Sequence, residues 1–430
     1  MTRTVLFVAP QFPPSNLTAG HRTRLFVRHL PEFGYRPIVL SVRPEYHEER
    51  LDPHIMELVD PKLEIVRTRA LPIRPIRVVG DMGIRSFPFH LAAIGRFVAE
   101  RPIDLLYIPI PPNYSALLGP LARKLYGLPY AIDYIDPWVY PPTPQQRRSW
   151  KAMATHALAR LLEPVALTGV GGITGVAQGY YAGVLARHPR LRKLPTAGIP
   201  YGGEPLDHAA ATGTPARLLD RPELRGKAVL VYAGALLPRA HDTLRTLLRA
   251  FRRWAASGDP RADQIRLLFV GTGARANDPT SGLVGPIARE EGAERFVVEI
   301  ADRQPYLDVL ALLHASQGVL ILGSSEASYT ASKTFQALHS GRPILAALHA
   351  GSTAAGFLRD VPGVELITFT DAEPVTHREA AFESGLRAVA AAGPGPIPRD
   401  LSILDQYSAR EMSRRLAAFF DAVLARQSQP

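Results

Sequence analysis

Two apolar runs joined by a short helical pattern constrain the fold of this chain more than any other feature. The first run is Val319–Leu322, and the second begins with Ile344 after the hook Gly341-Arg342-Pro343. Uninterrupted apolar runs of this length are typical of strands that are buried on both faces of a parallel sheet. The order predicts a βαβ unit whose helix begins near Ser332, at the carboxyl edge of the sheet. Free backbone N–H groups and the helix dipole favour a phosphate at such an end.

Short apolar runs and helical patterns alternate along the whole chain, and this alternation predicts parallel sheets with crossover helices. The predicted strands are Thr4–Ala9, Arg36–Val42, Leu63–Arg67, Leu105–Pro109, Tyr130–Tyr134, Gly172–Val176, Ala228–Ala233, Ile265–Val270, Phe296–Glu299, Val319–Leu322 and Val364–Phe369. The predicted helices include Thr23–Phe33, Phe89–Glu100, Ser115–Leu125, His241–Ala255, Tyr306–Ala315 and Tyr407–Ala425.

The length and the apolar content predict two domains. A chain of 430 residues that is 46% hydrophobic exceeds one ordinary core. A proline-rich connector over 188–226 separates the two alternating halves, and Gly393-Pro394-Gly395-Pro396 ends the second. We therefore expect two doubly wound α/β domains followed by a terminal helix.

Composition excludes several classes of chemistry and leaves others open. The chain has no cysteine, which excludes disulfides and thiol catalysis, and its net charge of +11 comes mainly from arginine. A general arginine bias or attraction to an anionic bilayer explains this charge. No nucleic-acid module is recognisable, so no nucleic-acid partner is expected. The uncharged stretch 165–186 is long enough to cross a membrane, but its six glycines favour a buried strand and a helix start.

Several segments resemble, in their order and spacing, the motifs of one enzyme family. Ser332–Ala346 resembles the nucleotide-binding region of the GT4-like group of GT-B glycosyltransferases, in which a Ser-Lys pair opens the helix. Pro10–Arg24 is similar to that group's glycine loop, and Asp133–Trp138 is similar to an Asp-x-x-Asp-Pro-Trp run. Val231–Asp242 and Arg303–Tyr306 are similar to its diphosphate-binding and base-reading segments.

This resemblance implies a domain plan. It implies two Rossmann-like doubly wound domains that face each other across a cleft. Residues 1–200 would bind the acceptor, 201–405 would bind the nucleotide sugar, and a helix within 406–430 would cross back onto the first domain.

The resemblance also implies roles for particular residues. Lys333 and Arg239 would bind the diphosphate and Asp136 would act at the reacting centre. The predicted donor-binding residues are Gly20, Gly234, Gly271, Arg303, Glu326, Ser332, Thr334 and Gln336. Arg22 or Arg24 would add positive charge near the glycine loop.

The sequence departs from the group's pattern at the diphosphate, sugar and ribose contacts. Gln336 stands where the group has a Glu, Ala235 replaces an Arg after Gly234, and Glu326 lies two residues from its expected register. Each segment also has an ordinary structural explanation, such as a βα loop, an Asp-Pro turn or a surface arginine.

The resemblance implies a glycosyltransferase of the hexosyltransferase type. It would move a sugar from a nucleoside diphosphate sugar to an acceptor hydroxyl, with retention of the anomeric configuration. UDP or GDP is the expected nucleotide, and a glycan, a lipid-linked sugar or a small molecule is the expected acceptor. No further cofactor and no metal are expected, because neither an Asp-x-Asp pair nor a spaced His, Asp and Glu cluster occurs. Basic side chains and helix N-termini would replace the metal ion at the diphosphate.

Two other functions fit the same sequence. One is a nucleotide-sugar 2-epimerase on this scaffold, and the other is a nucleotide-binding protein that has lost catalysis. No signal peptide is apparent, which favours a cytoplasmic protein. Arginine mixed with apolar residues in Leu71–Phe89 and Arg147–Leu162 would allow peripheral binding to an anionic membrane.

Overall fold

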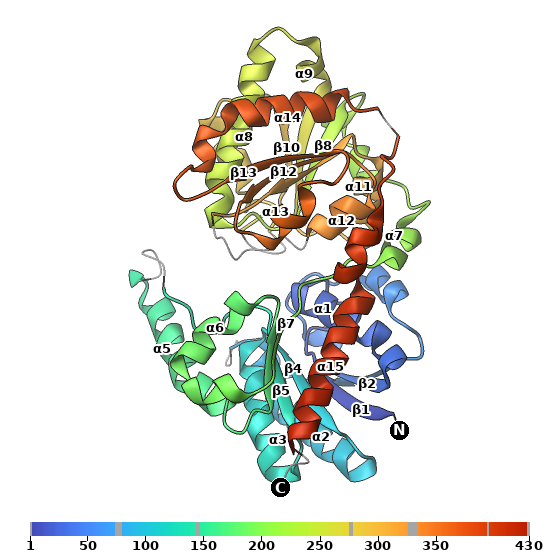
Figure 1. The fold of residues 1–430 in the computed structure, drawn as a ribbon, viewed down its shortest axis with the longest axis vertical. Helices are drawn as coiled ribbons and strands as arrows, with labels where there is room; N and C mark the ends of the chain where they lie inside the picture. Colours follow the sequence, from blue (N-terminus) through green and yellow to red (C-terminus); the bar gives the residue numbers. More distant parts are fainter. Residues whose placement is uncertain are drawn as a thin grey trace. The chain divides into compact units, whose positions relative to one another are not determined.

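The computed structural model describes residues 2–73, 80–142, 147–274, 278–325, 333–393 and 395–427. Its internal contacts divide the chain into two units. The first unit comprises Met1–Gly202 and Tyr407–Pro430, and the second comprises Gly203–Gln406. Each unit is a parallel sheet with helices on its faces (Figure 1). The boundaries expected near 200 and 405 remain predictions of independent domains.

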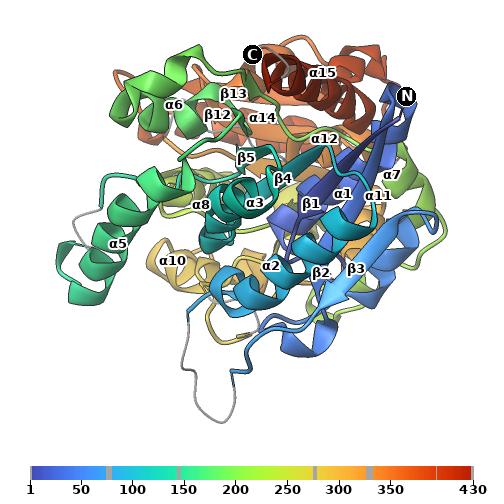
Figure 2. The same ribbon diagram turned by 90° about the horizontal axis from the view of Figure 1, so that it is seen from below.

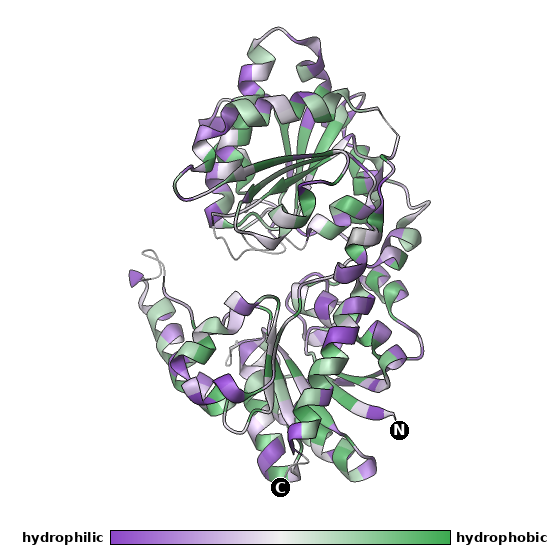
Figure 3. Cartoon of the chain, in the orientation of Figure 1, coloured by the Kyte–Doolittle hydropathy of each residue, from purple (hydrophilic) through white to green (hydrophobic). Residues whose placement is uncertain are grey.

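The first unit contains a parallel sheet, seven-stranded in the described residues, with the order β3-β2-β1-β4-β5-β6-β7. Buried apolar residues run along its central strands, as a sheet covered on both faces requires. Figure 3 shows this hydrophobic character along the strands. The strands are β1 Arg3–Val8, β2 Tyr35–Val42, β3 Glu64–Thr68, β4 Leu105–Ile110, β5 Tyr130–Tyr134, β6 Gly172–Gly175 and β7 Thr196–Gly198.

Helices cover both faces of this sheet. The described helices are α1 Thr18–His29, α2 Met82–Glu100, α3 Leu118–Tyr126, α5 Trp150–Ala166, α6 Gln178–Arg187 and α15 Ala409–Gln427. The first and last of these helices share one core with the sheet, while α2, α3, α5 and α6 contribute to the core on the other face. Figure 2 gives a second view of this arrangement. The terminal helix α15 is anchored by Phe420, whose ring lies 5.1 Å from that of Tyr107 and 6.3 Å from that of Phe7.

A buried ion pair joins α1 to β5 inside the first unit. Arg22 donates from Nε to Asp133 at 2.6 Å and from Nη2 to the other carboxylate oxygen at 3.0 Å. Its third nitrogen donates to the carbonyl of Ile199 at 2.8 Å, and Thr174 donates to Asp133 at 2.8 Å. Both charged side chains are fully buried. Arg22 is therefore a structural residue, and the expectation that it adds charge beside a diphosphate is wrong.

Removing one partner of this pair is expected to destabilise the first unit strongly. Asp133→Ala leaves the Arg22 guanidinium buried with only a carbonyl partner, at a cost of about 3 kcal/mol or more. Urea denaturation followed by circular dichroism measures the loss. The Asp60→Ala variant, whose carboxylate accepts only from the exposed Lys62 amide, is the control. A loss below 1 kcal/mol, on the order of a surface pair, would contradict the structural role.

The second unit contains a parallel sheet, six-stranded in the described residues, with the order β10-β9-β8-β11-β12-β13. Its strands are β8 Ala228–Ala233, β9 Ile265–Val270, β10 Val297–Ile300, β11 Gly318–Leu322, β12 Ile344–His349 and β13 Val364–Phe369. Its described helices are α7 Pro205–Ala211, α8 His241–Ala256, α9 Pro260–Gln264, α10 Val284–Glu290, α11 Tyr306–Ala315, α12 Lys333–His339, α13 Thr353–Leu358 and α14 Glu379–Ala391. The βαβ unit predicted from Val319 onward is β11, α12 and β12.

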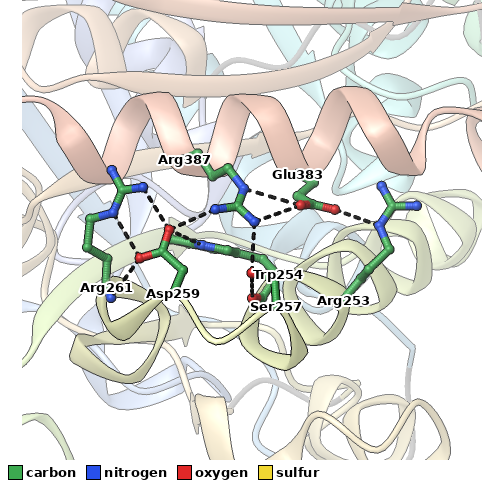
Figure 4. Close-up of polar contacts among 7 residues, drawn as sticks. All are labelled: Arg253, Trp254, Ser257, Asp259, Arg261, Glu383 and Arg387. Atoms are coloured by element: carbon green, nitrogen blue, oxygen red, sulfur yellow. Dashed lines mark hydrogen bonds and ion pairs between the residues drawn. The ribbon is translucent and has the colours of Figure 1, made fainter.

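Polar contacts fasten α14 to α8 and to the loop before α9 (Figure 4). Asp259 accepts from the indole nitrogen of Trp254 at 2.9 Å and from Arg387 at 2.7 Å. Arg387 also donates to Glu383 at 2.9 Å, and Glu383 accepts from Arg253 at 2.5 Å. Hydrogen bonds from Arg261, at 2.7 Å, and from Trp254 lower the pKa of Asp259. Together the polar contacts fix α14 over the sheet that carries the candidate site.

The strand predictions agree with the structure within one or two residues at each end, whereas several helix starts were placed wrongly. The first helix begins at Thr18, not at Thr23, so Gly20 lies inside α1. The second begins at Met82, because Asp81 caps it by accepting from the Ile84 amide at 3.1 Å, and Pro88 lies inside it. The stretch 165–186 forms the end of α5, β6 and most of α6.

Candidate functional site

The second sheet changes its direction of winding between β8 and β11. Successive strands proceed from β8 to β9 and β10 on one side, and from β11 to β12 and β13 on the other. The loops that follow β8 and β11 are held together, since the Ser325 amide donates to the Arg239 carbonyl at 3.2 Å. Thr243 also donates to the Gly323 carbonyl at 3.0 Å. Ligands of doubly wound sheets bind at this kind of edge, outside the carboxyl ends of the strands.

Two predicted glycines open this edge. Gly234 follows β8 with φ of 120°, and Gly271 follows β9 with φ of 75°, both in the region that disfavours other residues. Their backbones lie close together, because a Cβ built on Gly271 would be 3.9 Å from the Gly234 Cα atom. The Gly234 amide donates to the Val270 carbonyl at 2.8 Å. Because neither glycine carries a side chain, they leave space above β8 and β9.

The Lys333 ammonium lies in this space, buried and without a hydrogen-bond partner among the described residues. Its Nζ atom is 3.6 Å from the centre of the Tyr232 ring. A Cβ on Gly234 would be 3.4 Å from the same Nζ atom. Burial lowers the pKa of Lys333 to about 7. An unpaired buried cation is unfavourable, so the site favours an anion that would restore its charge.

The neighbouring Thr334 hydroxyl is also buried and has no hydrogen-bond partner in the described part of the chain. Lys333 and Thr334 thus offer two adjacent unsatisfied polar groups in the first turn of α12. Each such group favours a ligand that accepts a hydrogen bond. The predicted residues Ser332 and Glu326 lie outside the described residues.

Gln336, predicted at the ribose, takes part in a chain of hydrogen bonds within the second unit. Its oxygen lies 2.9 Å from Nε2 of His208, and its nitrogen donates to the Tyr306 hydroxyl at 3.0 Å. Tyr306 donates onward to Asp207 at 3.1 Å. Nδ1 of His208 lies 2.9 Å from Nε2 of His314. Each polar atom of the Gln336 amide therefore has one partner inside the unit, and a ribose hydroxyl would have to share that atom with it.

Sequence reasoning missed the histidines around Gln336. His208, His314 and His339 come from three helices, and the ring of His208 lies 5.0 Å from that of His314 and 5.2 Å from that of His339. They are far apart in the sequence and follow no motif spacing, so only the fold brings them together. Burial lowers the pKa of all three, that of His208 to about 3.

The His208 environment predicts a loss of stability in mild acid. In the folded chain the ring stays neutral down to a pH of about 3, whereas an unfolded histidine takes up a proton near pH 6.5. Its contribution is therefore complete above pH 6.5 and is lost as the pH falls below that value. The second unit is expected to lose about 2 kcal/mol from this group between pH 7 and pH 5.

Urea denaturation at pH 7 and pH 5 measures this loss in the native chain and in His208→Gln. The variant is expected to show a pH dependence smaller by about 2 kcal/mol. His377→Gln, on an exposed histidine of the same unit, is the control. An equal pH dependence in native chain and His208→Gln would refute the assignment.

In the first unit, Asp136 follows β5 and is exposed to solvent. Desolvation by the surrounding protein raises the pKa of its carboxyl to about 6, although the side chain keeps access to water. A carboxylate of this pKa suits a proton acceptor near neutral pH. Its neighbour Trp138 is a core residue.

Gly20 and Arg24 have internal packing roles. A Cβ on Gly20 would lie 2.5 Å from the Gln11 carbonyl oxygen, so the packing of α1 on the preceding loop already requires glycine. Arg24 is buried like Arg22. A donor contact at Gly20 stays a prediction.

Arg239 and Arg303, both predicted at the donor, lie at the starts of two helices of the second unit. Arg239 is exposed, just before α8, and Arg303 is half-buried, just before α11. Across the described ranges, no group of three or more His, Asp or Glu side chains is arranged to hold a metal ion. Among the helices described, none is long and apolar enough to cross a membrane.

Two parallel doubly wound units in one chain, with a last helix that returns to the first unit, define the GT-B fold of glycosyltransferases. Solved structures support this class. The chain is similar to alpha,alpha-trehalose 6-phosphate synthase from Burkholderia multivorans, with a TM-score of 0.62 and 11% identity over 100% of this chain and 98% of that one.

Two other similar structures have the same fold. Sucrose-phosphate synthase from Thermosynechococcus elongatus has a TM-score of 0.62 and 13% identity over 99% of this chain and 100% of that one. Anabaena HepE, solved in complex with UDP and glucose, has a TM-score of 0.60 and 14% identity over 98% of this chain and 100% of that one. No protein-family model and no curated protein sequence matches the chain.

Proposed function

We propose that this chain is a glycosyltransferase that moves a sugar from a nucleoside diphosphate donor to an acceptor hydroxyl. The observation that carries the proposal is the buried, unpartnered Lys333 ammonium at the switch point of the second sheet. Structures with the same fold include enzymes whose names specify UDP-forming synthesis and a protein solved with UDP and glucose. UDP or GDP is the proposed nucleotide.

The diphosphate would bind at the carboxyl edge of the second sheet. Lys333 and the Thr334 hydroxyl would donate to its oxygens, and the glycines at 234 and 271 would admit it close to the backbone. Arg239 would contribute a second cation. As the bond from the sugar to the diphosphate breaks, negative charge develops on the leaving oxygen, and fixed cations stabilise that charge. Ser332, Glu326 and the ribose contact of Gln336 belong to the same proposal.

The acceptor oxygen would form the new bond to the sugar, and its proton would pass to Asp136. We propose transfer with retention of configuration and without a metal ion or further cofactor. The acceptor is a hydroxyl of a glycan, a lipid-linked sugar or a small molecule. A cytoplasmic, peripheral location stays part of the proposal.

A catalytically inactive nucleotide-binding protein is the second candidate, and one observation favours it. The Gln336 amide that stands in for a carboxylate is already bonded on both of its polar atoms. A neutral amide whose polar atoms already have hydrogen-bond partners holds a ribose less firmly than a free carboxylate does.

A thermal-shift screen of UDP, GDP, ADP and dTDP, each with its common sugar conjugates, tests the proposal. A ligand present at a hundred times its Kd is expected to stabilise the second unit by about 2.7 kcal/mol. The stabilising donor is then incubated with and without a panel of acceptors. Transfer supports the proposal, and binding without transfer supports the inactive protein. Conversion of the donor alone into a new sugar nucleotide supports an epimerase, and no stabilisation by any nucleotide contradicts all three.

A further inference from the structure

Helix α5 exposes its large apolar residues to solvent. Trp150 is 76% exposed and Leu161 is 68% exposed, followed by Val165 at 49%, Leu158 at 42% and Met153 at 38%. Both Figure 1 and Figure 2 show α5 at the outer edge of the first unit. Exposed apolar groups gathered on one element mark a surface that another body covers.

The apolar residues of α5 form one continuous stripe. Positions 150, 154, 157, 158, 161 and 165 recur at helical spacing and hold Trp, Ala, Ala, Leu, Leu and Val. The buried residues of the same helix are Ala159, Glu163 and Ala166, on the opposite face. The helix is therefore reversed: its fully buried residues are two alanines and a glutamate, with Leu162 partly covered, and most of its large apolar residues face outward.

Basic residues flank this stripe on both sides. At 100° per residue, Lys151 lies on one border and Arg160 on the other, and both are exposed. The sole acid of α5, Glu163, is buried and bonded to Arg187 at 2.8 Å. The outward face of α5 is thus apolar at its centre and positive at its borders.

Helix α3, which packs against α5, extends the same character. It ends in the exposed apolar residues Leu125 and Tyr126, beside the basic residues Arg123 and Lys124. The whole chain has a net charge of +11, which adds a long-range attraction to anionic surfaces.

We propose that α5 lies in the plane of an anionic lipid bilayer and docks the first unit on it. An apolar stripe bordered by Lys and Arg is the pattern of interfacial helices, whose basic side chains reach the headgroups while the apolar face enters the acyl boundary. A tryptophan at one end suits the same boundary. A two-fold dimer through this face would place basic borders near each other, which disfavours a second copy of the chain.

Trp150 provides a direct probe, because the other two tryptophans, Trp138 and Trp254, are buried. Titration uses vesicles of phosphatidylcholine alone and vesicles of phosphatidylcholine and phosphatidylglycerol in equal parts. The anionic vesicles are expected to shift the Trp150 emission to shorter wavelength, with at least about tenfold tighter binding than the neutral ones. High salt is expected to weaken the binding.

Substitutions on the stripe test the surface itself. The double variant Leu158→Gln, Leu161→Gln is expected to lose about a hundredfold in apparent lipid affinity, since each leucine contributes about tenfold. Leu206→Gln, at a residue of α7 that is 50% exposed, is the matched control and is expected to bind like the native chain. Because all three leucines are exposed, melting temperatures are expected to stay unchanged.

Three results would overturn the proposal: no change in emission with either vesicle, equal binding to both vesicle types, or native-like binding by the double variant. A fourth such result would come from analytical sedimentation of the protein without vesicles. A native dimer that the double variant dissociates would assign the stripe to a second copy of the chain. None of these measurements depends on the proposed sugar transfer.

Discussion

Replacing Lys333 with methionine is expected to lower kcat/KM for sugar transfer by about a thousandfold. The ammonium is proposed to stabilise the charge that develops on the leaving diphosphate, and methionine keeps the side-chain length without the charge. The same substitution is expected to leave the melting temperature of the ligand-free chain unchanged or to raise it. A buried cation without a hydrogen-bond partner among the described residues is unfavourable, and methionine removes it.

This combination of lost activity and retained stability separates a ligand-binding lysine from a structural one. Lys227→Met is the matched control, because Lys227 lies in the same unit and its ammonium donates to the carbonyl of Asp263 in a solvent-exposed hydrogen bond. The control is expected to retain full activity. A Lys333→Met variant that unfolds readily, or one that turns over like the native chain, would argue against the site.

Replacing Asp136 with asparagine is expected to lower kcat by about a hundredfold to ten-thousandfold. The carboxylate is proposed to accept the acceptor proton, and an amide cannot do so. The pKa of about 6 also predicts a pH profile of kcat at saturating donor, where the bound diphosphate keeps Lys333 charged. Under this condition kcat of the native chain rises with pH as Asp136 loses its proton, and reaches a plateau above pH 7.

The pH profile distinguishes proton transfer from simple positioning. The residual activity of Asp136→Asn is expected to lack the rise near pH 6, whereas Asp136→Glu is expected to keep it. Asp360→Asn, at an exposed aspartate, is the control. A variant at 136 that retains the native profile would exclude the carboxylate as the proton acceptor.

The two sheets were predictable from sequence because strands buried on both faces are uninterrupted apolar runs. Val319–Leu322 and Leu267–Val270 are such runs, and the fold pairs both in parallel with β8. The short edge strand Thr196–Gly198 was missed, since it has three residues and lies in a segment rich in proline. The start of α1 was missed because Gly20 and the prolines before it indicate a loop.

Side-chain partners could not be predicted, because they depend on which elements meet. Arg22 and Asp133 are 111 positions apart in the sequence, and only the packing of α1 on β5 joins them. Gln336 was predicted to replace a ligand-binding Glu, and in the structure its amide is bonded to His208 and Tyr306. Lys333 was predicted from the segment that surrounds it, but its burial over the Tyr232 ring follows from the turn at Gly234.

The orientation of α5 could not be predicted from the sequence either. The sequence 150–166 is rich in leucine, alanine and basic residues, which suits a helix that buries its apolar side. Which side is covered depends on the neighbouring elements, and here Ala159 and Ala166 face the core.

Isothermal titration calorimetry of UDP and GDP at pH 8, in two buffers of different ionisation enthalpy, tests the central claim most directly. At this pH a lysine with a pKa of about 7 is mostly neutral, and a bound diphosphate favours its charged form. Binding is therefore predicted to take up about 0.9 protons in the native chain. The Lys333→Met variant is predicted to take up none. Binding heats that do not depend on the buffer, or the same proton uptake in the variant, would contradict the assignment of Lys333 to the diphosphate.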